Sequence, residues 1–72
     1  MLAFQIINSG KTIQINCDDQ GMATLISALQ KIRPSGGHVH LRGPSSGGSD
    51  LSEKTPWGES AAGEVILTWS GD

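Results

Sequence analysis

The chain has little cysteine, few aromatic residues and no long apolar run, and each shortage narrows the class of protein. Cys17 is the only cysteine among 72 residues, so no disulfide can form within the chain. A secreted domain of this size usually carries several disulfides, and we therefore expect a reducing, cytoplasmic environment. Residues 1–7 lack the basic start of a signal peptide, and no apolar stretch approaches the ~20 residues of a membrane span. We expect a soluble protein without a membrane partner.

Basic residues are also scarce, which argues against nucleic acid as a partner. The chain has five Lys and Arg, and they are scattered instead of clustered as phosphate binding requires. The charges are unevenly distributed, since residues 1–42 carry four basic against two acidic residues and residues 43–72 carry one basic against five acidic. The acidic second part can attract a basic partner, or it is simply solvated surface.

The length and composition are those of one small folded domain spanning residues 1–72. Apolar residues make up 36% of the chain, and ten glycines bring the share to an ordinary value for a globular protein. A chain of this length buries only roughly 60% of its unfolded surface. We therefore expect a thin core and marginal stability.

The first part of the chain predicts a β-hairpin. Apolar and polar residues alternate over 2–7 and again over 12–17, and residues 8–11 between them contain a glycine suited to a tight turn. Pairing Ile6 with Ile13 and Phe4 with Ile15 places the large apolar side chains on one face. We therefore predict this register, which a bulged turn at Gly10 would shift by one residue.

A helix is predicted over residues 19–32. Asp18 or Asp19 can cap its start, and Pro34 is expected to end it. Its apolar residues recur at spacings of three or four and form one stripe: Met22, Leu25, Ile26, Leu29 and Ile32.

Two further strands are predicted over 38–42 and 64–69, which gives the order ββαββ. The expected fold is α+β, a four-stranded antiparallel sheet with the helix packed on the face that carries Phe4, Ile15, Leu41 and Leu67. The other face would remain uncovered, and a homodimer through that face or through an edge strand is one possibility. That face would carry Ala3, Gln5, Thr12, Gln14, His38, His40, Ile66 and Thr68.

The connection over residues 43–63 is rich in glycine and serine. This composition favours a mobile loop, and a connection of this length is usually either functional or disordered. Residues 43–49 can also present backbone N–H groups to an anion, although the lysine of a phosphate-binding loop is absent.

The candidate binding residues are His38, His40 and Arg42, whose side chains lie on one face of their strand because successive side chains alternate between faces. This face is either solvated surface, or a partner-binding surface, or half of a metal or anion site. A zinc ion would need a third ligand, for which Asp50, Glu53 and Glu59 are the candidates.

We predict neither an enzyme nor a cofactor. The loop hydroxyls lie outside any nucleophile-elbow pattern, and no catalytic residue is assigned. Trp57, between Pro56 and Gly58, either docks back on the core or anchors a partner.

Several segments together resemble immunity protein family 32 of bacterial polymorphic toxin systems. They are Gly36-Gly37-His38-Val39-His40-Leu41, Pro44-Ser45, Gly47-Gly48 and Asp50-Leu51-Ser52-Glu53. The preceding hairpin, the helix start and the length also fit. The resemblance implies a small bacterial protein that binds and neutralises a cognate toxin. On this interpretation the expected partner-binding residues are His38, His40, Arg42, Asp50, Glu53 and Trp57, and the alternative is a small metal- or anion-binding module using the same histidines.

Overall fold

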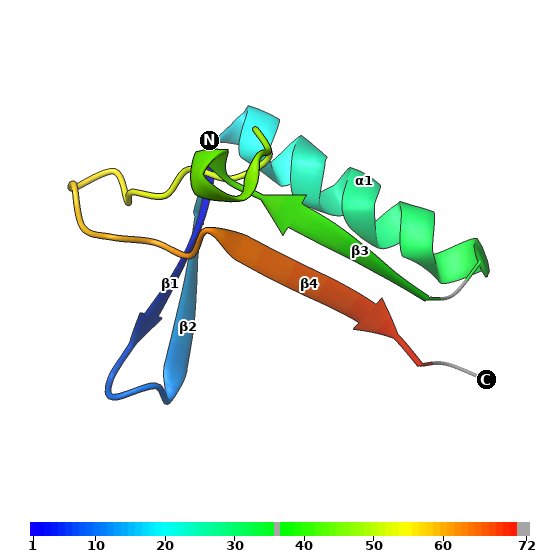
Figure 1. The fold of residues 1–72 in the computed structure, drawn as a ribbon, viewed down its shortest axis with the longest axis horizontal. Coiled ribbons are helices and arrows are strands. Elements are labelled where there is room, and N and C mark those ends of the chain that lie inside the picture. Colours follow the sequence, from blue (N-terminus) through cyan, green and yellow to red (C-terminus); the bar gives the residue numbers. More distant parts are fainter. Residues whose placement is uncertain (36, 71–72) are drawn as a thin grey trace.

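A computed structural model describes residues 1–35 and 37–70, and its elements follow the predicted ββαββ order of an α+β fold (Figure 1). The elements are β1 (Leu2–Ile7), β2 (Thr12–Cys17), α1 (Asp19–Ser35), β3 (Gly37–Arg42), a short 3₁₀ turn (Pro44–Ser46) and β4 (Glu64–Trp69). The alternation of apolar and polar residues therefore located all the strands within one residue.

The β1–β2 hairpin has the predicted register. Phe4 pairs with Ile15 and Ile6 with Ile13, so these four side chains share one face. The turn uses three residues with positive φ, namely Asn8, Ser9 and Gly10. Ile7 pairs with Thr12, so residues 8–11 form the loop and the predicted register is kept without a one-residue slip.

The prediction of a single four-stranded sheet is wrong. β1 pairs only with β2 and β3 only with β4, which gives two separate antiparallel hairpins that diverge from each other (Figure 1). The connection between β3 and β4 explains the separation. The backbone N–H groups of Ser52 and Ala62 donate to the carbonyls of Leu2 and Phe4, at 2.7 and 2.8 Å, and so occupy the outer edge of β1. The second hairpin cannot pair with an edge that is already bonded.

That connection is far more structured than its composition predicts. Leu51 and Thr55 are each only 4% exposed, and Leu51 belongs to the core cluster. Backbone hydrogen bonds link Ala61 to Glu53 and Thr55 to Glu59. The glycines and serines are therefore accommodated in a folded segment that covers one hairpin edge.

Helix α1 begins as predicted but ends later. The Asp18 carboxylate accepts a hydrogen bond from the Gly21 backbone N–H at 2.8 Å, which is the expected N-terminal cap. The helix continues to Ser35 and does not end before Pro34. The φ angle of proline is compatible with a helix, and so near the C-terminal end its missing N–H removes only one intrahelical hydrogen bond. This helix is too short and too polar to cross a bilayer, and the described residues contain no other candidate span.

The buried face of the helix overlaps the predicted apolar stripe only at Leu25 and Ile32. Met22, Ile26 and Leu29 are 47–51% exposed, whereas Ala28 and Ile32 are buried. Gly21 is also buried, beside the backbone of Met1 and the side chain of Cys17. Two diverging hairpins offer no flat sheet to a broad apolar stripe, so the helix approaches closely through its small residues. With about 100° between successive residues, the buried face is rotated by roughly 75° from the centre of the stripe.

The core is correspondingly small and lies where the helix meets the bases of both hairpins. Phe4 and Leu41 are in it as predicted, but Ile15 is 48% exposed and Leu67 is only partly buried. The buried cluster consists of Leu2, Phe4, Ala28, Leu41 and Leu51.

Candidate functional site

The three residues singled out on β3 lie on one face of the strand, as predicted. In the β3–β4 register, His38 is opposite Thr68, His40 opposite Ile66 and Arg42 opposite Glu64. We call these six residues the outer face of β3–β4. All are exposed except His40, which is half-buried, while Val39 and Leu41 on the other face contact the core.

A network of charged groups orders one end of this outer face. Glu64 Oε2 accepts hydrogen bonds from His40 Nδ1 at 2.8 Å and from Arg42 Nε at 3.0 Å. The bond from His40, and next the bond from Arg42, hold the pKa of the Glu64 carboxyl below its usual range. Because one carboxylate holds both partners, the side chains of His40 and Arg42 are constrained before any ligand arrives.

The two histidine rings touch each other. Their centroids are 5.0 Å apart and the rings are nearly perpendicular, at 73°. The two histidines could supply at most two ligands to a metal ion. Among the residues described by the structure, no cluster of three His, Cys, Asp or Glu is suited to hold one. Of the predicted third ligands, Glu53 and Glu59 instead hydrogen-bond elsewhere.

Ile66 is an apolar side chain within this polar outer face. It is 54% exposed and lies directly across from His40. An exposed aliphatic group surrounded by oriented polar groups has the arrangement of a protein interface, where an apolar centre is surrounded by a polar rim.

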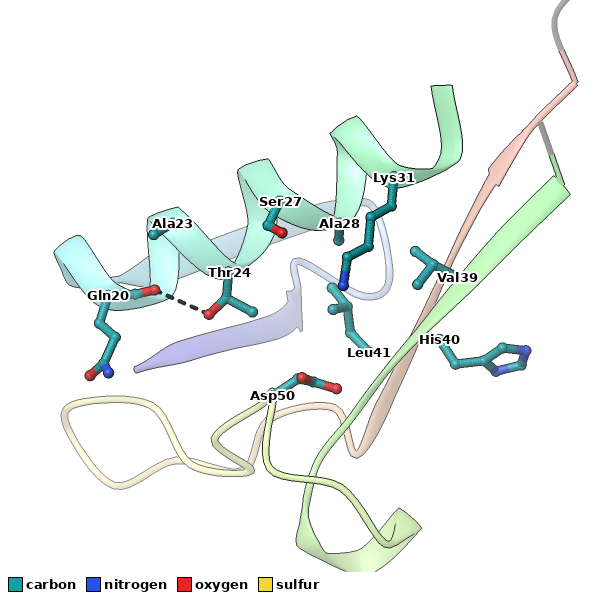
Figure 2. Close-up of a pocket in the computed structure, with 10 residues that line it drawn as sticks. All are labelled: Gln20, Ala23, Thr24, Ser27, Ala28, Lys31, Val39, His40, Leu41 and Asp50. Atoms are coloured by element: carbon teal, nitrogen blue, oxygen red, sulfur yellow. Dashed lines mark hydrogen bonds between the residues drawn. The ribbon is translucent and has the colours of Figure 1, made fainter. Parts of the chain in front are cut away.

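A cleft of about 470 Å³ lies between α1 and β3, beside the outer face (Figure 2). Asp50 lies at its floor and accepts a hydrogen bond from the Arg42 backbone N–H at 3.2 Å. The Lys31 side chain extends into the cleft from the helix, whereas the ring of His40 points away from it (Figure 2). Its lining comprises Gln20, Ala23, Thr24, Ser27, Ala28, Lys31, Val39, His40, Leu41 and Asp50.

The cleft does not place its hydroxyl groups beside the histidine. The Thr24 hydroxyl donates to the Gln20 backbone carbonyl at 3.1 Å, and His40 bonds to Glu64 on the outer face. The cleft therefore offers one basic and one acidic side chain, Lys31 and Asp50, for hydrogen bonding. The hydroxyl of Thr24 is not paired with a general base there.

Glu53 has a structural contact in the loop. Its carboxylate accepts a hydrogen bond from the Ser45 backbone N–H at 2.6 Å, which lowers the pKa of Glu53. It also packs so closely against Gly43 that a side chain at that position would collide with it. Glu53 thus helps to hold the 3₁₀ turn in place, and its role as a partner contact stays a prediction.

Trp57 makes its hydrogen bond to Glu59 and not to the histidines. It is 52% exposed, and its indole N–H donates to Glu59, which also accepts from Gln5 of β1 at 2.9 Å. Trp57 is not among the residues of the core cluster, so the alternative that it anchors a partner stays a prediction. The structure places His38, His40 and Arg42 on one strand face, joins Asp50 to the Arg42 backbone on the side of the cleft, and gives Glu53 and Trp57 other contacts.

Sequence reasoning placed Ile66 on the face of the histidines, as observed, but missed Glu64 and Lys31 as members of this region. Alternation along 64–69 puts Glu64 on the same face as Ile66, but the register with β3 was needed to place Glu64 opposite Arg42. Lys31 follows from no local pattern, since its position over the cleft depends on how the helix is rotated.

The Glu64 network predicts a pH dependence of stability. A carboxyl whose folded pKa is lowered stabilises the fold above its unfolded pKa, and this stabilisation is lost as the pH falls. Melting temperatures of the wild type should therefore drop below about pH 4.3, the ordinary glutamate value.

The variant Glu64→Gln should show a shallower drop than the wild type over that range. Thermal melts followed by circular dichroism between pH 7 and pH 3 measure both. High salt should reduce the difference because the groups are exposed. Parallel pH profiles for the two proteins would contradict the assignment.

Comparisons of the chain with protein-family models, with curated proteins and with solved structures found no significant match. The resemblance to immunity protein family 32 therefore stays a prediction, supported by the residues quoted above.

Proposed function

We propose that this domain is a non-enzymatic immunity protein that binds and neutralises a cognate bacterial toxin through the outer face of β3–β4. The observation that carries the proposal is the exposed Ile66 beside side chains already fixed by Glu64. Binding then costs little side-chain entropy at the polar positions, because their geometry exists in the free protein.

The resemblance supplies the kind of partner. The resemblance rests in part on Gly37-His38-Val39-His40-Leu41, and the two histidines of this segment lie in the proposed interface. The acidic balance of residues 43–72 favours a toxin with a basic surface, and such a pair should associate faster at low salt.

The test is co-expression with the product of the adjacent gene, followed by binding measurements on the purified proteins. The neighbour should be toxic alone and harmless when this protein is present. His38→Ala and Ile66→Ala should each weaken binding at least tenfold, mainly by faster dissociation, because both truncate the proposed interface. Gln30→Ala, on the exposed side of α1, is the matched control and should leave binding unchanged.

Two outcomes would contradict this function. A neighbour that is harmless alone, or that stays toxic and unbound in the presence of this protein, removes the immunity interpretation. Stoichiometric zinc or phosphate binding that is lost in His38→Ala, without any toxin binding, would instead support the alternative of a small metal- or anion-binding module, for which the contact between the two rings is the only structural support.

A further inference from the structure

Large apolar side chains are also exposed away from the outer face of β3–β4, on the first hairpin, on α1 and at the end of β4. They form three strips that each begin at the core. We call these strips together the open apolar face, and its members are 41–66% exposed: Ile6, Ile13 and Ile15 on the first hairpin, Met22, Ile26 and Leu29 on α1, and Trp69 on β4.

Each of the three strips begins next to a residue that belongs to the core or packs against it. Ile15 pairs with the buried Phe4, and Ile6 and Ile13 continue the same face toward the hairpin tip. The helix strip adjoins Leu25, which packs against the core, and Trp69 shares its strand face with the partly buried Leu67. The exposed strips are thus an extension of the core that the chain itself leaves uncovered.

The surface area of the molecule is larger than one copy should expose. A folded monomer of 7.5 kDa is expected to expose roughly 4,200 Å², whereas this chain exposes 4887 Å². The excess of roughly 600 Å² approaches the ~800 Å² per partner of a standard protein interface.

The chemistry of this face favours a second copy over a charged partner. None of its seven members carries a charge or a hydrogen-bonding side chain other than the Trp69 indole. Interfaces between identical subunits are more apolar than transient ones and are depleted in charge. The acidic residues and the ordered polar groups described above lie elsewhere.

The backbone also leaves room for a partner at the first hairpin. The outer edge of β1 is bonded to the loop, but β2 makes no backbone hydrogen bond, within the described part of the chain, other than those to β1. Two-stranded sheets are marginal alone, and an open edge is commonly covered by association. The hairpin projects away from the helix (Figure 1), so its strip can reach a neighbouring molecule.

We propose that two copies of this chain form a symmetric dimer through the open apolar face. The projecting hairpin strip of one copy packs on the helix strip of the other, and the two-fold axis repeats the contact in the reverse direction. The sequence predicted a dimer through the other sheet face or through an edge strand, and the contact proposed here uses neither as its main surface. It is also independent of the proposed toxin binding, since the outer face of β3–β4 stays uncovered.

The first experiment measures mass in solution by light scattering and sedimentation between about 1 μM and 1 mM, a range spanning ordinary dimer affinities. The wild type should show twice the mass of the 7.5 kDa chain. Ile13→Lys and Leu29→Lys should each weaken dimerisation at least tenfold, because each buries an unpaired charge in the interface. The control Ile66→Lys makes the same change on the outer face and should leave the dimer intact.

A measurement on the wild type covers the case in which the lysine variants unfold. Isotope-filtered NMR on a mixture of labelled and unlabelled protein should show intermolecular contacts between the Ile13 or Ile15 methyl groups and the side chains of Met22 or Leu29. A monomer at 1 mM, an absence of such contacts, or dissociation by Ile66→Lys alone would overturn the proposal. A monomer that binds another protein through this face would overturn it equally.

Discussion

Replacing Leu41 by alanine should lower the free energy of unfolding by about 2–5 kcal/mol, the cost of truncating a buried leucine. Leu41 is 3% exposed and belongs to the cluster that joins β1, α1 and the loop. Small domains have only about 5–15 kcal/mol of stability, and a 72-residue chain is expected near the low end. A large fraction of the protein should therefore be unfolded at modest urea concentrations.

Urea titrations followed by circular dichroism, at one fixed protein concentration, measure this loss. Ile66→Ala is the matched control, since it truncates an exposed aliphatic side chain in the neighbouring strand and should change stability by less than about 0.5 kcal/mol. Equal losses in the two variants would show that the core does not lie where the helix meets the hairpins.

Replacing Gly21 by alanine should destabilise the protein, although alanine is normally the better helix former by about 1 kcal/mol. A Cβ atom at this position would lie 1.7 Å from the Met1 carbonyl oxygen and 3.1 Å from the Cys17 side chain. The oxygen belongs to the backbone and accepts a hydrogen bond from the Asp18 N–H, so it cannot simply move away. We expect a loss of about 1–3 kcal/mol or more, the cost of overpacking.

The same urea titration tests this prediction. Ala23→Gly, at an exposed position of the same helix, is the control and should cost about 1 kcal/mol through helix propensity alone. If Gly21→Ala instead raised the midpoint, the helix would not approach the first hairpin as closely as the structure indicates.

The sequence by itself determined the local structure of this protein. Alternation over 2–7, 12–17 and 64–69 predicted the strands, and the apolar pairs of the first hairpin predicted its register, because a slip of one residue would turn Phe4 to the other face. The same alternation placed His38, His40 and Arg42 side by side. These are properties of neighbouring residues, and the periodicity of a strand or a hairpin is sufficient to predict them.

Only the tertiary structure decided how these elements pack. The loop over 43–63 bonds to the outer edge of β1 through Ser52 and Ala62, and this bonding separates the two hairpins that would otherwise form one sheet. The separation in turn removes the flat surface that the apolar stripe of α1 would cover. The helix therefore packs through Gly21 and Ala28, and Leu29 remains exposed. Hydrogen bonds between segments about fifty residues apart in sequence leave no periodic pattern, and for that reason the sequence could not reveal them.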